Sequence, residues 1–499
     1  MTSVPSQALT PNTYAYEQQA LVKATGFREY DARWLFGSEI NLAGIQDLGL
    51  CLGTLLHRRG VRPHIVVGHD YRAYSSAIKY AMTSGLIAAG CHVHDIGLCT
   101  TPMAYFAQFA LDVPAVAMVT ASHNENGWTG VKMGLDRPLT FGPDDMLELK
   151  TLTLEGRGQS RSGGGLTRVT DMYERYKADL VKPGKLSRKL KVAAVCGNGT
   201  AGAFAPQVLR EAGCEVIEID CALDYTFPHY NPNPEDLKML AVMKDAVKVH
   251  GLDAAFGFDG DGDRCGVADN EGHVIYADKI GLMMARDMAV LVPNTTFVVD
   301  VKSTGLFATD PVLAQHGAKT DYYKTGHSYI KRRTRDLNAS AGFEKSGHFF
   351  FRPPFGHGYD DGLVSALSIC RMLDRAAGKS LADLYRALPV SFTSPTMSPH
   401  CGDEVKYDVV DKLITRIKAD AGSKRLIEGQ AIVNTNTVNG IRFTFADGSW
   451  GLVRASSNKP ELVVVCESMS SEAHMRGIFH YIQALLKEFP DVGAFNQTV

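Results

Sequence analysis

The pattern of hydrophobic and polar positions repeats three times along the chain. Each repeat has a short apolar, β-branched run, a glycine turn, a stretch with helical spacing, and a closing glycine before another apolar run; the first runs start at Ile65, Val192 and Phe297. A strand, a helix and a second strand in this order form a β-α-β unit. The starts lie about 105 to 130 residues apart, which is domain size rather than solenoid size. We therefore expect three successive α/β domains of similar design.

The last hundred residues follow a different pattern. The stretch VNGIRFTFADGSWGLVRASSNKPELVVVCES contains two or three strand-like runs joined at 446–448 and 458–460, and SEAHMRGIFHYIQALLKEF has the spacing of an amphipathic helix. This pattern predicts a C-terminal α+β unit. Between the first two domains, EGRGQSRSGGG (155–165) has the composition of a flexible linker or exposed loop.

Composition narrows the class of protein. The chain has 499 residues, 45% hydrophobic and 21% charged, with a formal net charge of -2. This balance gives no electrostatic footprint for nucleic acid or a membrane surface, and no apolar run reaches the roughly 18 residues of a membrane span. The ten cysteines occur singly, without a C-x-x-C pair, as is typical of buried thiols in a reducing compartment. We expect a cytoplasmic protein that binds neither nucleic acid nor membranes.

The stretch AAFGFDGDGDRCGVADNEGHVI carries the strongest chemical signal. Asp259, Asp261 and Asp263 alternate with glycines after an apolar run, so three carboxylates can point to one side. Clustered carboxylates favour a hard cation such as Mg²⁺ or Ca²⁺. An EF-hand is excluded because Arg264 replaces its glycine and Asn270 its glutamate. A Mg²⁺ site with an open coordination position is favoured, and a solvated acidic turn is the alternative.

The stretch MVTASHNENGWTGVKMG predicts a strand that runs into a tight loop. Ser122 lies near the end of that strand, where open α/β sheets place their chemistry. A hydrolase nucleophile is not indicated, because Thr120 and Asn124 stand where G-x-S-x-G needs glycines. A polar strand-end loop and a phosphoserine that offers oxygens to a metal both remain open.

Four stretches, in this order, resemble the signature loops of the α-D-phosphohexomutases, the phosphoglucomutase and phosphomannomutase group. They are TASHNENGWTGVKMG, GFDGDGDRCGV, GFEKSGHFFF and GLVRASSNKPELVV, and the similarity runs from about Phe27 to the C-terminal helix. The resemblance implies a four-domain architecture, with three similar α/β domains and a C-terminal α+β domain around a central active-site cleft. The expected segments are an N-terminal extension (1–22), domain I with the phosphoserine loop (23–168), domain II with the metal-binding loop (169–276), domain III with the sugar-binding loop (277–392) and domain IV with the phosphate-binding loop (393–499).

The resemblance also implies roles for the first three loops. Ser122 corresponds to the serine that is phosphorylated in the active enzyme, and His348 is the first choice for a general acid/base because imidazole titrates nearest neutrality. The implied ligands of one Mg²⁺ per active site are Ser122, Asp259, Asp261 and Asp263. The implied catalytic residues are Arg33, Ser122, His123, Lys132, Arg264 and His348.

The remaining matches imply substrate contacts. Glu344 and Ser346 of EKSGH would hold adjacent sugar hydroxyls, since a carboxylate can accept two hydrogen bonds from a diol. Arg454 of the fourth loop would bind the phosphate that is not being transferred. The implied substrate-binding residues are Tyr30, Lys324, Thr325, Gly326, His327, Glu344, Ser346, Arg454, Ser456, Ser457 and Asn458.

The implied activity is interconversion of hexose 1-phosphate and hexose 6-phosphate, with a phosphoserine enzyme and a hexose 1,6-bisphosphate as intermediate and activator. Glucose and mannose differ at C2, so contacts limited to the 3- and 4-hydroxyls would accept both sugars. An amino-sugar phosphate mutase is one alternative; a non-catalytic sensor is another, against which the intact serine and aspartates argue. The expected partners are small-molecule sugar phosphates, and the expected state is a monomer or weak homo-oligomer.

The chain departs from the family pattern at a few positions. Trp34 and Glu125 stand where glycine and proline are usual. Lys345 replaces the methionine that is typical of bacterial enzymes accepting both sugars, and the fourth loop reads R-A-S-S-N-K-P, with Lys459 before its proline. These departures bear on sugar preference and on the N-terminal and fourth loops, and leave the serine and the aspartates intact.

Overall fold

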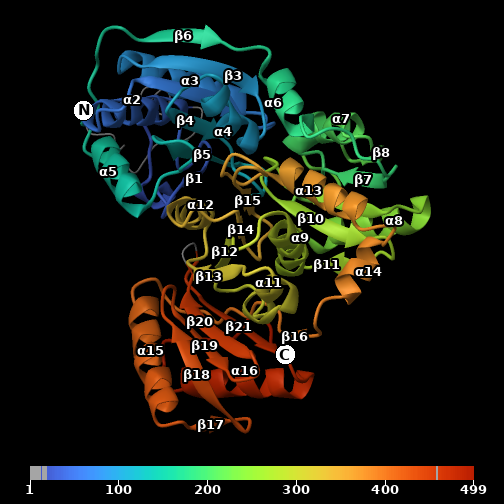
Figure 1. Cartoon of the computed structure of the whole chain (residues 1–499). Helices are drawn as coiled ribbons and strands as arrows, with labels where there is room; N and C mark the ends of the chain where they lie inside the picture. Colours follow the sequence, from blue (N-terminus) through green and yellow to red (C-terminus); the bar gives the residue numbers. More distant parts are fainter. Residues whose placement is uncertain (1–12, 14–18, 457–458) are drawn as a thin grey trace. The chain divides into compact units, whose positions relative to one another are not determined.

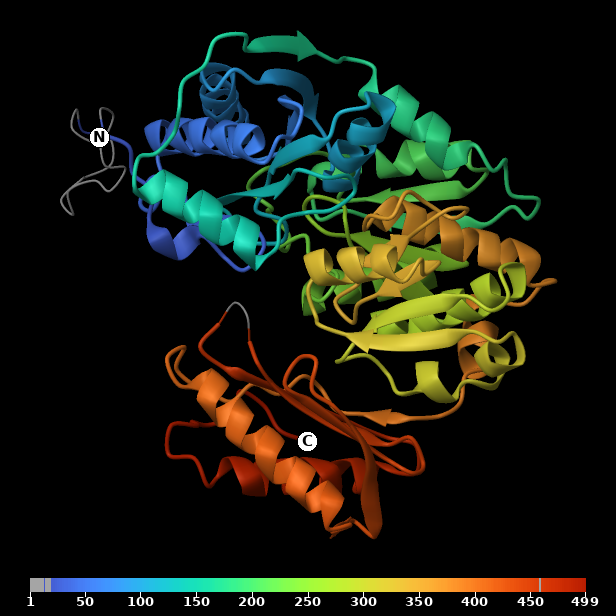
Figure 2. The same cartoon turned by 60° about the vertical axis from the view of Figure 1, so that its left-hand side comes forward.

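The computed structural model describes residues 13, 19–456 and 459–499, which form two compact units. The first unit comprises the chain up to Ala277 together with Ser346–Asp383, and the second comprises Asp278–Lys345 together with Leu384–Val499. Figure 1 labels the elements along the chain, and Figure 2 shows them from a second side. Across the described ranges, no helix has both the length and the apolar character needed to cross a membrane.

The first domain is built on a six-stranded sheet. Its strands are β1 (Ala32–Leu35), β2 (His64–His69), β3 (His92–Leu98), β4 (Ala115–Val119), β5 (Trp128–Gly134) and β6 (Gly165–Arg168), and its helices are the 3-10 turn η1 (Ala24–Gly26), α2 (Leu42–Arg58), α3 (Ser75–Ala88), α4 (Thr101–Ala110) and α5 (Pro143–Leu154). The strand order is β1-β5-β4-β2-β3-β6, with β4, β2, β3 and β6 parallel. Side chains of α2, α3 and α5 join Ile65, Val67 and Val93 in one core. Ser122 therefore follows the carboxyl end of an inner strand.

The segment 155–165 is an exposed loop and not a linker between domains. The Arg161 N–H donates to the Ala88 carbonyl (2.9 Å), and the Gln159 N–H donates to Thr54 Oγ1 (2.8 Å). The segment leads directly into β6, which pairs with β3. Of the two predicted alternatives, the structure favours the exposed loop over the flexible linker, because these backbone hydrogen bonds anchor a glycine-rich stretch to two helices, and composition does not reveal such partners.

The second domain has the strand order β11-β10-β9-β7-β8. Its elements are α6 (Met172–Val181), β7 (Lys191–Val195), the 3-10 turn η2 (Thr200–Ala203), α7 (Ala205–Glu211), β8 (Glu215–Ile219), α8 (Leu237–His250), β9 (Ala254–Phe258), β10 (Cys265–Asp269) and β11 (Val274–Ile275). The later segment of this unit adds β15 (Phe349–Phe351) and α13 (Gly362–Arg375), with α13 packed against β10 and α7, and α14 (Leu381–Arg386) begins at its end. The central strand, β9, lies beside β7 and leads directly into the loop that carries the three aspartates.

In the second unit, β12 pairs in parallel with β13 on one side and β14 on the other. The elements are α9 (Ala277–Leu291), β12 (Thr296–Asp300), α10 (Leu306–Thr309), α11 (Pro311–Gln315), β13 (Lys319–Tyr323), α12 (His327–Asp336) and β14 (Ala341–Phe343). In the first domain β2 likewise lies between β3 and β4, and in the second domain β7 lies between β8 and β9. This shared strand arrangement confirms the three similar α/β domains predicted from the repeats.

The C-terminal domain has a separate antiparallel sheet in the order β16-β21-β20-β19-β18-β17. Its elements are β16 (Phe392–Thr393), α15 (Lys406–Gly422), β17 (Leu426–Ile427), β18 (Gln430–Asn436), β19 (Ile441–Phe445), β20 (Trp450–Ala455), β21 (Leu462–Ser468) and α16 (Glu472–Leu486). Side chains of α15 and α16 share one core with alternate residues of β19, β20 and β21. The predicted strands and final helix are confirmed, while the apolar spacing did not single out α15 or the short edge strands.

A buried carboxylate joins the C-terminal sheet to the α/β part of the second unit. Glu467 on β21 is fully buried and pairs with Lys279 of α9 at 2.8 Å. The Glu467 carboxylate also accepts hydrogen bonds from Thr304, Gly305, Ser391, Thr393 and Trp450. Burial alone would raise the pKa of Glu467, but Lys279 and these donors hold that pKa well below its usual range.

Replacing this carboxylate tests how strongly it stabilises the unit. Glu467→Gln leaves the Lys279 ammonium buried without its counter-charge, so we expect a loss of about 3–5 kcal/mol. Urea unfolding followed by tryptophan fluorescence measures the loss, with Glu472→Gln, which removes an exposed ion pair to Arg476 worth about 0.3–0.5 kcal/mol, as control.

The same variant has a pH signature. Because the pKa of Glu467 is lowered by folding, its contribution is present above the unfolded value of about 4.3 and is lost as the pH falls below it. The difference in stability between wild type and Glu467→Gln should therefore shrink on acidification. Equal unfolding midpoints for Glu467→Gln and Glu472→Gln at neutral pH would contradict this account.

Candidate functional site

Ser122 lies in a constrained turn directly after β4. Its φ of 52° puts a non-glycine residue in the left-handed region, a conformation that persists only when its surroundings fix it. The Ser122 N–H donates to Thr120 Oγ1 (2.8 Å), and Arg72 donates to the Ser122 carbonyl (3.0 Å). The residue is only 4% exposed. Its hydroxyl is therefore held in one place.

The aspartate loop meets the serine loop at its backbone. A Cβ on Gly260 would lie 2.4 Å from the Ser122 carbonyl oxygen, so only glycine fits between the two loops. Ser122 Oγ donates a hydrogen bond to Asp259 Oδ2 at 3.2 Å. The first two predicted loops, which are more than a hundred residues apart in sequence, thus form one site.

The three aspartates form a fully buried cluster in which one carboxylate oxygen from each lies within 4.8 Å of the others. Lys132 on β5 donates to Asp261 Oδ2 (2.8 Å) and also to Asp263. Asp261 Oδ1 and Asp263 Oδ1 are nevertheless buried without a hydrogen-bond donor in the described part of the chain. Oxygen ligands lacking donors suit a hard divalent cation. The cluster could hold a metal ion.

The negative charges of the three aspartates need positive charges nearby to balance them. Burial, together with the negative charges of Asp261 and Asp259, raises the pKa of Asp263 to about 7. Burial would lower the pKa of Lys132, but Asp261 and Asp263 outweigh it and raise that pKa well above its usual value. Lys132 is therefore a permanent cation beside the carboxylates, and a bound metal ion would favour the ionised form of Asp263.

Arg264 and His123 complete the surroundings of Ser122. Arg264 is buried and donates from Nε to Asp259 Oδ2 (3.0 Å). His123 Nδ1 lies 3.3 Å from Ser122 Oγ. The positive charge of Arg264, with that of Arg33, lowers the pKa of His123 from its usual value. His123 is thus a neutral hydrogen-bonding neighbour of the serine.

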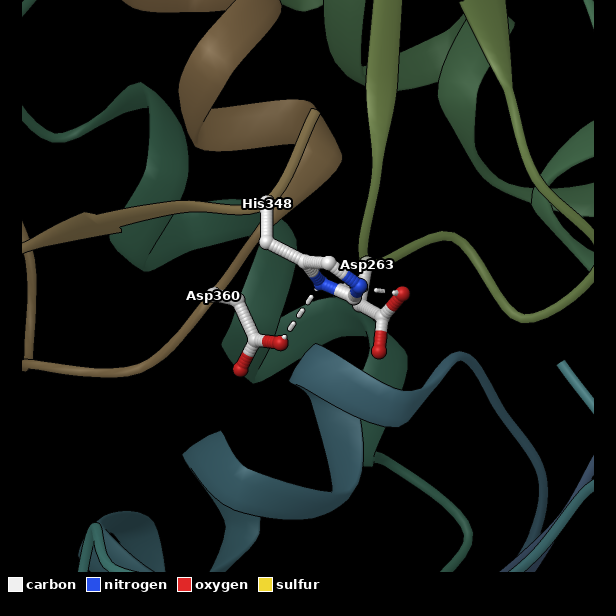
Figure 3. Close-up of side chains that lie close together, drawn as sticks. All are labelled: Asp263, His348 and Asp360. Atoms are coloured by element: carbon white, nitrogen blue, oxygen red, sulfur yellow. Dashed lines mark hydrogen bonds and ion pairs between the residues drawn. The ribbon is translucent and has the colours of Figure 1, made fainter. Parts of the chain in front are cut away.

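His348 lies beside the third aspartate, as Figure 3 shows. Its Nδ1 is 2.9 Å from Asp360 Oδ2 and 3.6 Å from Asp263 Oδ1. His348 precedes β15, and Asp360 precedes the Asp361 cap of α13. The predicted acid/base candidate is therefore brought to the aspartate loop and oriented by a carboxylate.

Of the two N-terminal candidates, Arg33 contacts the serine loop and Tyr30 lies before the first strand. Arg33 on β1 donates to the Thr120 carbonyl (3.0 Å). Tyr30 is half-buried just before β1. Trp34, the departure from the family pattern, is fully buried and donates from Nε1 to the Lys23 carbonyl (2.8 Å). The Trp34 side chain is therefore part of the core of the first domain and does not displace Arg33.

In the second unit, the KTGH segment lies beside Glu344. Glu344 is 2% exposed at the end of β14, and the Gly326 N–H donates to its Oε1 (2.9 Å). Lys324, Thr325 and Gly326 connect β13 to α12, which begins at His327. Ser346 is half-buried and opens the later segment of the first unit.

Two of the phosphate-loop candidates, Arg454 and Ser456, lie at the end of β20. Arg454 is 7% exposed and donates from Nη1 to the Ala455 carbonyl (2.9 Å). Lys406 donates to the Ser456 carbonyl (2.6 Å), which places a cation against this loop. Ser457 and Asn458 lie outside the described residues.

Three contributors to the first-unit site were not found from the sequence. Arg72 donates to the carbonyls of Ser122, Asn124 and Glu125, and so carries the serine loop. The Thr101 hydroxyl donates to Asp261. Asp360 orients His348. The available signal for Arg72 was its place in GHDYR, just after a strand end, where polar residues of α/β sheets gather.

Comparison with known families matches three consecutive parts of the chain. They are described as phosphoglucomutase/phosphomannomutase alpha/beta/alpha domain I over residues 24–158, domain II over 172–272 and domain III over 276–392. A phosphomannomutase/phosphoglucomutase of Pseudomonas putida is 33% identical over 91% of this chain and 93% of its own. One from Pseudomonas syringae pv. tomato is 32% identical over 94% of this chain and 96% of its own.

A solved structure agrees with these sequence relatives. The crystal structure of a phosphoglucomutase/phosphomannomutase family protein from Burkholderia thailandensis has a TM-score of 0.85 at 29% identity, covering 94% of this chain and 98% of that one. Fold and site define a multidomain α/β protein with a buried carboxylate cluster beside a constrained serine. The chain belongs to the phosphoglucomutase/phosphomannomutase family.

Because the serine loop and the aspartate loop touch at Gly260, adding one methyl group at this position should affect divalent-metal binding. Gly260→Ala should force the aspartate loop away from Ser122 and weaken divalent-metal binding by about 10- to 100-fold, the range for lost support of metal ligands. Mn²⁺ titration followed by electron paramagnetic resonance measures this. Gly422→Ala, at a helical glycine with open space around it, is the control. Equal Mn²⁺ affinity in both variants would show that the loops are not in contact.

Proposed function

We propose that this protein is a phosphohexomutase that interconverts the 1-phosphates and 6-phosphates of glucose and mannose, with Ser122 as the phosphoryl carrier. The observation that carries the proposal is the 3.2 Å hydrogen bond from Ser122 Oγ to Asp259 in the buried carboxylate cluster. It puts a hydroxyl that can accept a phosphoryl group next to a site suited to a divalent ion. The names of the similar Pseudomonas proteins support the same substrates.

The proposed ion is one Mg²⁺, held by Asp259, Asp261, Asp263 and an oxygen of phosphorylated Ser122. Mg²⁺ usually combines a few carboxylates with phosphate oxygens and water, which agrees with three aspartates and a neighbouring phosphoserine. When bound, the ion would draw charge from the phosphoryl group and so stabilise its transfer.

Lys132 and Arg264 supply the remaining charge balance. A phosphoserine adds about -1.5 to -2 charges. Lys132 contacts Asp261 and Asp263, and Arg264 contacts Asp259, so both cations lie next to the place where that charge arrives. Because both side chains are buried, water screens them little. Lys132 and Arg264 stabilise the phosphoserine dianion before the reaction. They also stabilise the negative charge that spreads over its oxygens during phosphoryl transfer.

His348 is the proposed general acid/base. Asp360 holds its Nδ1, which fixes the ring and makes Nε2 the nitrogen that exchanges a proton with the sugar hydroxyl. Phospho-Ser122 gives its phosphoryl group to that hydroxyl: the Oγ–P bond breaks, the sugar O–P bond forms, the hydroxyl proton passes to His348, and Ser122 Oγ takes up a proton from water. The resulting hexose 1,6-bisphosphate reorients and returns its other phosphoryl group: that sugar O–P bond breaks, the Oγ–P bond forms again, Ser122 releases its proton to water, and His348 returns its proton to the freed sugar oxygen.

The sugar and the second phosphate are assigned to the remaining candidates. Glu344, whose orientation is fixed by the Gly326 N–H, and Ser346 bind adjacent ring hydroxyls, and the KTGH segment adds further contacts. Arg454, with Ser456, Ser457 and Asn458, binds the phosphate that stays on the sugar. Since the two ring poses exchange the phosphate positions, the same groups serve both half-reactions.

Initial rates test this assignment. With Mg²⁺ and a trace of the matching 1,6-bisphosphate, the enzyme should convert glucose 1-phosphate and mannose 1-phosphate at comparable rates. Ser122→Ala removes the phosphoryl acceptor and should lower both rates by at least about a thousandfold. Ser160→Ala, an exposed serine in the 155–165 segment, is the matched control and should keep wild-type rates.

Three results would contradict the proposal in different ways. Full activity of Ser122→Ala would remove the serine from the mechanism. Turnover of amino-sugar phosphates alone would replace glucose and mannose as substrates. Absence of turnover on all these sugars would favour a non-catalytic sensor.

A further inference from the structure

Three histidines gather at the amino ends of β2 and β3, at the opposite end of these parallel strands from Ser122. His64 opens β2, His92 opens β3 directly beside it, and His94 lies two residues further along β3. Their ring centroids lie 5.0 to 5.4 Å apart. None of these side chains has a part in the phosphoryl transfer proposed above.

Two of the rings bring one nitrogen each to within hydrogen-bond distance. His64 Nδ1 lies 3.1 Å from His94 Nε2. With metal–nitrogen bonds of about 2.0–2.1 Å, two imidazole nitrogens on one metal are separated by about 2.9 Å at a right angle and about 3.3 Å at a tetrahedral angle. The observed separation falls between these values. The two nitrogens form a hydrogen bond with each other, and a metal ion would take the place of the proton that they share.

The third histidine packs against this pair and is fixed from its other side. His92 Nε2 lies 2.8 Å from Thr167 Oγ1 on β6. A side chain at Gly165 would meet His92 Nδ1 at 2.8 Å, so glycine leaves the room in which the ring lies. Rings that coordinate metals are commonly oriented by contacts of this kind from neighbouring groups.

The electrostatics of the pair favour neutral rings with lone pairs for a metal. Burial, reinforced by His92 and His64, lowers the pKa of His94 to about 4, and burial followed by His92 lowers the pKa of His64. The nearby cation Arg62 is engaged by Asp112 at 3.2 Å. All three histidines are partly exposed, so an ion can reach them from solvent.

We infer that His64 Nδ1 and His94 Nε2 form a second metal site, selective for a borderline divalent transition metal such as Zn²⁺, Ni²⁺ or Cu²⁺. Imidazole nitrogens prefer these ions to Mg²⁺, which favours oxygen ligands, so the site is chemically distinct from the aspartate cluster. Water would complete the coordination. A metal bound here would tie β2 to β3 without entering the phosphoryl-transfer chemistry.

Calorimetric titration of the full chain with Zn²⁺ tests the inference, with excess Mg²⁺ present to occupy the aspartates. Wild type should bind one more equivalent of Zn²⁺ than the His64→Gln/His94→Gln double variant. His250→Gln, at an exposed histidine on α8, is the matched control and should bind as wild type does. Equal Zn²⁺ stoichiometry in wild type and the double variant would overturn the site.

A second readout keeps the test independent of folding. Thermal unfolding without Zn²⁺ shows whether the double variant is folded. If the double variant is not folded, the single His94→Gln variant is used in its place. Wild type loaded with Co²⁺ should show strongly shifted imidazole proton resonances that are lost in His94→Gln. Their absence from wild type would overturn the inference without any variant. Mutase rates play no part in either readout, so failure here is distinct from failure of the proposed function.

Discussion

Three carboxylates buried at the end of one strand are the constraint on which the site depends. Asp259, Asp261 and Asp263 are fully buried within a few ångströms of one another, an arrangement that repels itself unless positive charge is placed beside it. Two cations, Lys132 and Arg264, meet this demand only in part, because two carboxylate oxygens still lack donors in the described chain. The cluster is therefore suited to a further cation and, next to it, to a group that brings negative charge of its own.

The surrounding elements can be understood from that requirement. Lys132 comes from β5, the serine from the turn after β4, and the aspartates from the turn after β9, so two sheets must present their strand ends to each other. Gly260 lets the loops touch, and Arg72 uses three carbonyls to hold the serine loop in its left-handed turn. A buried carboxylate with a full set of partners also occurs at Glu467, where it joins the C-terminal sheet to the rest of the second unit.

Much of this could be predicted from the sequence, because the relevant signals are local. The repeats specify the strand, turn and helix of each domain, and the alternation of aspartate with glycine specifies the carboxylate cluster within five residues. What could not be predicted depends on partners far along the chain. Arg72, Thr101 and Asp360 act only because the fold brings them to loops that begin elsewhere, and the glycine-rich 155–165 segment is anchored by helix groups that its composition does not reveal.

The central claim is that Ser122 carries the phosphoryl group beside the carboxylate cluster. Peptide mapping by mass spectrometry after incubation with glucose 1,6-bisphosphate and Mg²⁺ tests it most directly. The account predicts one phosphoryl group per chain, on the peptide that contains Ser122 and on that residue. A phosphoryl group on another residue, or turnover by protein that never acquires one on Ser122, would contradict it.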